Sequence, residues 1–223
     1  VPLCTGTLTL PCVAMAVLSF PAVPSQRVQS GAVVALTELL EERGGRRPRF
    51  VPDAQRIKLG GCAPAIDAWQ LSAYTVVIFD GIEPDPSERV VFACLEAFRA
   101  GDCDSVIAVG GGSSMDVAKV VSVLARGQQD LSEIYGVGMV SGDRLPLFLA
   151  PTTAGTGSEV TPGAIIPPGE TTSAAVSTPA LLPNAATLAA LLTLGVAPTI
   201  PAHRGSHTRR SSTESLDLAR TET

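Results

Sequence analysis

The 223-residue chain is 45% hydrophobic and only 17% charged, a composition that supports one substantial core, or one domain and part of a second. With 21 acidic and 16 basic side chains, its net charge is −5 at pH 7, and Lys58 and Lys119 are its only lysines. Binding to a phosphate backbone needs clustered cations, so this charge balance argues against a nucleic-acid partner. Five cysteines without CxxC spacing indicate reduced, mostly buried thiols rather than a disulfide framework or a zinc site.

The first 26 residues carry no charge and contain an apolar run at 13–20 of the length found in signal peptides. Four prolines interrupt any helix there, and neither an initiating methionine nor a basic segment precedes the run. We interpret residues 1–26 as an apolar segment that leads into an early strand. We therefore expect neither secretion nor a membrane partner, and predict a cytoplasmic location, with an organellar matrix left open.

Hydrophobic spacing alternates between helix and strand periods from residue 33 onward. The first helix is indicated by Val33, Leu36 and Leu40, and Gly44-Gly45 supplies its stop. The later elements are a short strand at 49–53, a broken helix at 57–71, a strand at 74–79, a helix at 88–99, a strand at 106–109, an amphipathic helix at 117–124 and a strand at 145–150. Strands that alternate with helices of this length predict an α/β fold with a doubly wound, Rossmann-like parallel sheet.

A glycine triplet follows the apolar strand at 106–109. Gly110, Gly111 and Gly112 let the backbone approach a ligand closely, and the first N–H groups of the helix that follows have no intrahelical partner. The turn therefore suits a phosphate or pyrophosphate, although a tight βα turn that binds nothing is the alternative. Neither a GxGxxG fingerprint nor a P-loop is present.

A hydroxyl-rich loop, residues 151–162, follows the strand at 145–150. Ligands of open parallel sheets bind at the carboxyl ends of strands, so this loop and the glycine turn are candidates for one site. In the loop, Thr152, Thr153, Thr156 and Ser158 can donate to phosphate, ribose or carboxamide groups, although such loops are often simple turns.

The helix after the glycine turn carries Ser113, Asp116 and Lys119 among its polar side chains. Ser113 and Asp116 have the spacing of a capping box, and this structural role for Asp116 competes with direct ligand contact. Lys119 stands three residues after Asp116, and an exposed pair at that spacing contributes only about 0.2–0.5 kcal/mol. We therefore expect Lys119 on the solvated surface.

Three motifs together carry a family resemblance. GGGSSMDVAK at 110–119, PTTAGTGSEVTP at 151–162 and DGIEPDP at 80–86 resemble the iron-type (group III) alcohol dehydrogenases, with a match from about residue 20 to about residue 198. The resemblance implies an NAD(P)-dependent oxidoreductase that transfers hydride between a small alcohol or carbonyl substrate and nicotinamide.

The resemblance also implies the cofactor contacts. It places the pyrophosphate at Gly110, Gly111, Gly112 and Ser113 and the nicotinamide side at Thr152, Thr153 and Thr156. Asp116, Ser158 and Asp53 complete the predicted set of cofactor-binding residues.

Two further acidic residues bear on the cofactor. Asp53 follows the first strand of the sheet, where a carboxylate binds the adenosine ribose and repels a 2′-phosphate, so NAD is predicted over NADP. A solvated loop aspartate is the alternative. Asp85 is expected to cap the next helix, with a place in the cofactor cleft as the alternative.

The resemblance implies a two-domain architecture. In it, a helical second domain supplies one Asp and three His as ligands to Fe²⁺ or Zn²⁺, and the metal acts as a Lewis acid. Here residues 167–198 resemble the crossover towards that domain, after an α/β unit at 27–166. His203 and His207 lie beyond it, in a polar tail at 199–223 whose composition is typical of disorder. We therefore expect no metal ligands in this chain.

Two classes of function remain from the sequence. The first is the nucleotide half of an iron-type dehydrogenase, inactive as this chain stands, and the second is a non-catalytic nucleotide-binding remnant. A glycerol or hydroxyacid dehydrogenase or a maleylacetate reductase is a third alternative. A homo-oligomer stays open.

Overall fold

The computed structural model describes residues 23–28, 32–53, 57, 62, 63, 66, 67, 69, 74–153, 155–167 and 174–188, with the backbone alone at 28 and 32–35. Its centre is a six-stranded, all-parallel sheet of order β1-β9-β6-β4-β2-β3. The strands are β1 (Gln26–Val28), β2 (Pro48–Pro52), β3 (Val77–Ile78), β4 (Ser105–Gly110), β6 (Leu147–Pro151) and β9 (Ala185–Leu188).

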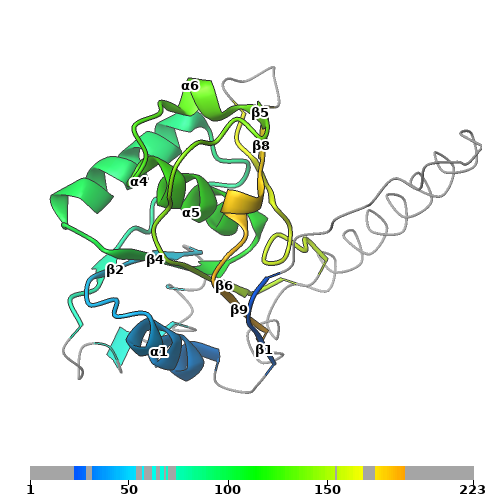
Figure 1. The fold of residues 1–223 in the computed structure, drawn as a ribbon. Helices are drawn as coiled ribbons and strands as arrows, with labels where there is room; N and C mark the ends of the chain where they lie inside the picture. Colours follow the sequence, from blue (N-terminus) through cyan, green and yellow to red (C-terminus); the bar gives the residue numbers. More distant parts are fainter. Residues whose placement is uncertain are drawn as a thin grey trace, which may run out of the picture.

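Helices cover both faces of this sheet (Figure 1). The helix α1 (Ala32–Glu42) lies on one face, and α4 (Glu88–Ala100) and α5 (Gly112–Leu124) lie on the other. Successive residues of β4 face opposite sides, so Val106 and Ala108 join the core under α4 and α5, whereas Ile107 and Val109 join the core under α1. This two-sided burial explains why the strand reads as a continuous apolar run, and it confirms the predicted doubly wound α/β fold.

A second, three-stranded sheet of order β5-β8-β7 packs against α5. Its strands are β5 (Gly136–Val137), β7 (Gly163–Ile165) and β8 (Ala175–Ser177), with β7 antiparallel to β8. The short helices α6 (Leu131–Ile134) and η1 (Pro179–Leu181) flank it. Ala164 and Val176 turn inward and share the core of α5. The small sheet therefore covers the side of α5 that the main sheet leaves open.

The structure departs from the predicted elements at three places. Only Val77–Ile78 of the expected strand at 74–79 forms a strand, and α5 is buried on nearly every side rather than amphipathic, because two sheets enclose it. Strand β9 comes from the stretch that resembles a crossover, and it lies between β1 and β6 in the main sheet. Of the predicted helix at 57–71, the described positions 57, 63, 66, 67 and 69 are helical.

The free cysteines that the structure describes, Cys62, Cys94 and Cys103, are all buried. Within the described ranges, no helix has the length and apolar character that crossing a bilayer demands. The predictions for residues 1–22 and for the tail at 199–223 lie outside the described residues.

Candidate functional site

The two predicted ligand loops lie at one edge of the main sheet. Strands β4 and β6 are parallel neighbours in which Gly110 pairs with Pro151. Beyond that pair, Thr152 N donates to Gly110 O at 2.9 Å. The hydroxyl-rich loop, called the threonine-rich loop below, therefore leaves the sheet beside the glycine turn. On the other side of β4, Asp53 N donates to Val109 O at 3.0 Å. The carboxyl ends of β2, β4 and β6 therefore meet, as the sequence predicts.

The helix α5 begins at this edge. Gly111 is its N-cap in an extended conformation, and the first helical bond runs from Met115 N to Gly111 O at 3.2 Å. The N–H groups of Gly112 and Ser113 precede that bond, so they have no carbonyl acceptor within the helix, and the positive end of the helix dipole lies there. No side chain caps the helix, so the predicted capping box of Ser113 and Asp116 is wrong.

Gly110 and Gly112 have different surroundings. A Cβ on Gly110 would stand 2.5 Å from Ser114 Oγ and 2.7 Å from Ser114 Cβ, too close for any side chain, and 3.3 Å from Asp53 Cβ, a tight contact. A Cβ on Gly112 would meet nothing closer than Thr156 Cγ2 at 3.5 Å, an ordinary contact. The glycine at 110 is therefore required by the packing of α5 on β4, whereas the glycine at 112 borders open space.

That open space is a cleft of about 300 Å³ between the two loops. Its lining residues are Asp85, Pro86, Gly112, Ser113, Asp116, Thr156, Ile165 and Pro167. Thr156 Oγ1 is buried and has no hydrogen-bond partner in the protein. Because a buried hydroxyl without a partner is costly, this atom marks a position where a ligand can supply the missing bond. The cleft thus joins backbone donors, a hydroxyl and two carboxylates.

Asp85 lies in the cleft rather than at a helix cap. Ser87 is the N-cap of α4, and Asp85 is exposed with a left-handed backbone, φ 49°. The expected capping role is therefore wrong, and Asp85 instead lines the cleft.

The remaining predicted site residues surround the cleft without lining it. Thr152 is almost fully buried and Thr153 partly so, and both already interact within the protein, as does Asp53. Ser158 is buried behind the loop, where its hydroxyl donates to Asp116 Oδ1 at 2.6 Å. The structure thus brings Gly112, Ser113, Asp116 and Thr156 together in one space and arranges the others behind it.

Lys119 is wholly buried, so the predicted surface position is wrong. Its ammonium donates to Ser158 Oγ at 2.9 Å, Thr161 O at 3.1 Å and Gly163 O at 2.8 Å. Burial lowers the pKa of Lys119 to about 8, although the negative charges of Asp116 and Glu159 act in the opposite direction. The spacing of Asp116 and Lys119 on one helix gave no indication that the lysine is buried. Its hydrogen-bond acceptors come from a segment about forty residues further along the chain.

Asp116 faces the same buried cluster. Its Oδ2 accepts from Ile165 N at 3.1 Å, and its Oδ1 lies 3.9 Å from Lys119 Nζ. Burial raises the pKa of Asp116, while the bond from Ser158 and the charge of Lys119 oppose that rise. Both carboxylate oxygens therefore already have partners inside the protein.

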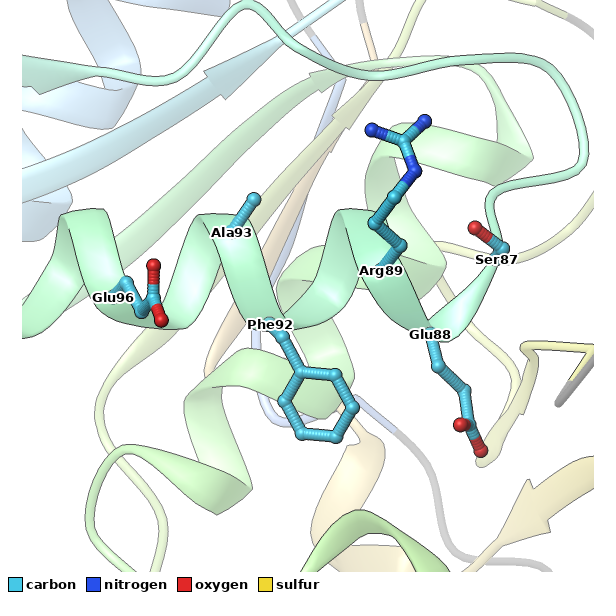
Figure 2. Close-up of a pocket in the computed structure, with 6 residues that line it drawn as sticks. All are labelled: Ser87, Glu88, Arg89, Phe92, Ala93 and Glu96. Atoms are coloured by element: carbon cyan, nitrogen blue, oxygen red, sulfur yellow. The ribbon is translucent and has the colours of Figure 1, made fainter.

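A second hollow, of about 600 Å³, lies on the outer side of α4 and contains no predicted site residue. It is lined by Ser87, Glu88, Arg89, Phe92, Ala93 and Glu96 (Figure 2). Arg89 pairs with Glu83 at 2.8 Å, and Phe92 projects from the helix with 45% of its surface exposed. This surface lacks the convergent donors that distinguish the cleft.

Comparisons with known proteins agree with the fold. The family model described as iron-containing alcohol dehydrogenase matches residues 24–190. 4-Hydroxybutyrate dehydrogenase from Cupriavidus necator is 37% identical over 170 residues, which are 74% of this chain and 44% of that relative. Lactaldehyde reductase from Escherichia coli (strain K12) is 32% identical over 133 residues, 59% of this chain and 35% of that relative. The chain therefore spans less than half the length of these relatives.

Solved structures show the same likeness. A crystal structure of 1,3-propanediol oxidoreductase superimposes with a TM-score of 0.79 and 28% identity, over 84% of this chain and 49% of that one. The crystal structure of sulfoacetaldehyde reductase from Bifidobacterium kashiwanohense in complex with NAD⁺ superimposes with a TM-score of 0.77 and 29% identity. The match covers 85% of this chain and 50% of that one. Sequence and fold therefore lead to one assignment: this chain belongs to the iron-containing alcohol dehydrogenase family.

Proposed function

We propose that the chain is the nucleotide-binding part of an NAD-dependent alcohol oxidoreductase. The observation that carries this proposal is the cleft in which the start of α5 faces Thr156, whose buried hydroxyl has no protein partner. Membership of a dehydrogenase family, and the NAD⁺ complex of a related reductase, support a dinucleotide as the ligand.

Each predicted contact then has a role in this proposal. The N–H groups of Gly112 and Ser113 donate to the diphosphate, which the positive end of the α5 dipole also attracts. Gly110 and Gly111 bring strand and helix close enough for the ligand to reach those donors. The hydroxyl of Thr156 binds the cofactor, and Thr152 and Thr153 form the turn that presents it.

Asp53 supports NAD rather than NADP in this scheme. It follows β2 and lies next to Gly110, beside the cleft edge, where a carboxylate accepts hydrogen bonds from the ribose and repels a 2′-phosphate. Asp116 and Ser158 bind one another and Lys119, so we assign them to holding the site rather than to direct cofactor contact.

The family name implies iron, but the described residues do not fit a metal. No group of three or more His, Cys, Asp or Glu that could hold an ion occurs within the described part of the chain. His203 and His207 lie outside it. We therefore derive no step through a metal, and the choice between iron and zinc stays a prediction for the whole protein.

The substrate proposal concerns the whole protein. The related dehydrogenases and reductases are named for 4-hydroxybutyrate, lactaldehyde and 1,3-propanediol, all small molecules with a hydroxyl or carbonyl group. We propose a small alcohol or carbonyl substrate of the same kind, and we expect the 223-residue chain to bind NAD without turning over an alcohol. A non-catalytic nucleotide-binding module is the second candidate.

Calorimetric titration of the full chain with NAD tests the proposal. We expect saturable binding, weaker binding of NADP, and a loss of at least about tenfold in NAD affinity for Gly112→Val, because its side chain would occupy the cleft next to Thr156. Ala93→Val adds the same kind of side chain on the outer side of α4 and serves as the control. A native chain that binds no NAD would contradict the proposal.

An alcohol oxidation assay with the same preparation, with Fe²⁺ or Zn²⁺ added, tests the expected inactivity of the chain. We expect no NADH to form. Turnover by the purified chain would refute the expected inactivity and leave the dinucleotide site in place.

A further inference from the structure

Lys119 connects α5 to the segment that follows the threonine-rich loop. All three of its acceptors, Ser158 Oγ, Thr161 O and Gly163 O, belong to residues 158–165, and none belongs to its own helix. An ammonium group can donate three hydrogen bonds, so this buried lysine is fully satisfied by one segment of the chain. The lysine therefore acts on residues 158–165 rather than on solvent or ligand.

Asp116 binds the same segment from the preceding turn of α5. It accepts from Ser158 Oγ at 2.6 Å and from Ile165 N at 3.1 Å, at the two ends of the segment. Lys119 contacts the middle, so one turn of helix holds the whole segment. The lysine and the aspartate also offset one another's charge in a site where a lone buried ion would be strongly unfavourable.

This connection bears directly on the cleft. The segment begins two residues after Thr156 and ends at Ile165, and both of these residues line the cleft opposite Gly112 and Ser113. A shift of the segment away from α5 would therefore carry the Thr156 hydroxyl away from the helix start. Sites that bind through preorganised groups lose affinity when such support is removed.

We propose that Lys119, through Ser158 and the carbonyls of Thr161 and Gly163, is the positioning residue that sets the width of the cofactor cleft. Together with Asp116 it forms a clamp, defined as the Asp116–Lys119–Ser158 cluster. The proposal rests on the proposed dinucleotide site, because its effect on function is an effect on NAD affinity. A merely structural lysine would change stability without a selective change in the cleft.

Three variants test the clamp in the full chain. Lys119→Met removes all three donated bonds and keeps an unbranched apolar stem, and Ser158→Ala removes only the bridging hydroxyl. The matched control is Ser122→Ala, because Ser122 is equally buried on α5 but donates only to Lys119 O, at 2.7 Å. That change deletes a buried hydrogen bond on the same helix without touching residues 158–165.

Two measurements are made on each variant: NAD affinity by calorimetry, and amide hydrogen exchange of residues 156–166 without cofactor. We expect Lys119→Met to weaken NAD binding by about tenfold or more and to speed exchange in that segment. Ser158→Ala should also weaken NAD binding and speed exchange, but by a smaller factor than Lys119→Met. Ser122→Ala should leave the NAD affinity and the exchange rate within about twofold of the native chain.

Unchanged affinity and exchange in Lys119→Met would overturn the proposal. So would changes in Ser122→Ala as large as those in Lys119→Met, because they would reveal a general loss of stability. If Lys119→Met does not fold, Ser158→Ala decides by the same two criteria. If the native chain binds no NAD, the dinucleotide proposal fails, and the exchange data alone decide whether the clamp holds the segment.

Discussion

Gly110 and Ser114 approach so closely that a methyl group at position 110 would stand 2.5 Å from the Ser114 hydroxyl oxygen and 2.7 Å from Ser114 Cβ. Strand β4 and helix α5 can meet at this distance only because residue 110 has no side chain. The contact fixes how far the start of α5 stands from the sheet, and so where its first N–H groups lie. The close packing of the two elements is therefore part of the site.

Gly110→Ala should destabilise the chain by about 1–3 kcal/mol, because the new methyl group forces strand and helix apart. Denaturation in urea measures the change. The control is Gly163→Ala, whose Cβ would meet nothing closer than Val176 O at 3.9 Å and which should cost far less. Adding Ser114→Gly to Gly110→Ala should recover part of the loss, and equal stability of the two alanine variants would contradict the packing argument.

Asp53→Ala should raise the affinity for NADP relative to NAD by about tenfold, or about 1.4 kcal/mol, because the carboxylate no longer repels a 2′-phosphate. Titrations of the native chain and the variant with both dinucleotides measure the ratio. Asp80→Asn removes the same charge from an exposed position after β3 and should leave the ratio unchanged. An unaltered ratio in Asp53→Ala would favour the solvated loop aspartate.

Tyr135→Phe should destabilise the chain by about 0.5–1.5 kcal/mol. The Tyr135 hydroxyl lies 2.8 Å from Glu88 Oε1 and 3.1 Å from Ile166 O, so it joins the start of α4 to the wall of the cleft. Burial, followed by the bond to Glu88, raises the pKa of this phenol, so it stays protonated throughout the neutral range. Denaturation of Tyr135→Phe, Glu88→Ala and the double variant gives the coupling energy, and strict additivity would show that the bond contributes nothing.

The stability of the native chain should rise relative to Lys119→Met between about pH 8 and pH 10. A lysine in the unfolded chain keeps its proton up to its ordinary pKa of 10.5, whereas the buried Lys119 releases it above about 8. The unfolded state thus binds more protons in this window, which makes the slope of unfolding free energy positive, at most about 1.4 kcal/mol per pH unit. Asp116 and Glu159 are the acidic groups whose charges act on the ammonium, and both raise the pKa of Lys119 against the larger effect of burial.

Unfolding free energies of both proteins at several pH values in that window give the difference directly. Groups outside the clamp contribute equally to the two proteins and cancel. A difference that is constant with pH would show that Lys119 keeps an ordinary pKa in the fold.

The sequence predicted the longer elements, in which hydrophobic residues recur at a regular spacing. Strand β4 and helix α4 carry buried side chains at uniform spacing, so their existence and type follow from the pattern alone. The small sheet β5-β8-β7 could not be found this way, because strands of two or three residues carry no period. Its absence from the predicted fold also explains why α5 was expected to keep a solvated side.

The two loops that form the candidate site could be predicted from the sequence, but the buried side chains that support them could not. The glycine turn and the threonine loop each follow a strand, and parallel neighbours end at one edge, so Gly112 and Thr156 were placed together correctly. The burial of Lys119 depends on a segment distant in sequence, and no local pattern indicates such a contact. The sequence does contain one signal that, in retrospect, fits this result: Lys119 is one of only two lysines in the chain.

The place of β9 in the sheet has a consequence for how this protein is made. Among the described strands, β1 is the first to leave the ribosome and β9 is the last, yet β1 has β9 as its sole hydrogen-bonded neighbour. The inner strands β2, β4 and β6 can assemble as they emerge, whereas β1 has to wait unpaired until almost the whole described chain has been translated. Of the described strands, β1 is therefore the one that stays without its partner for longest during synthesis.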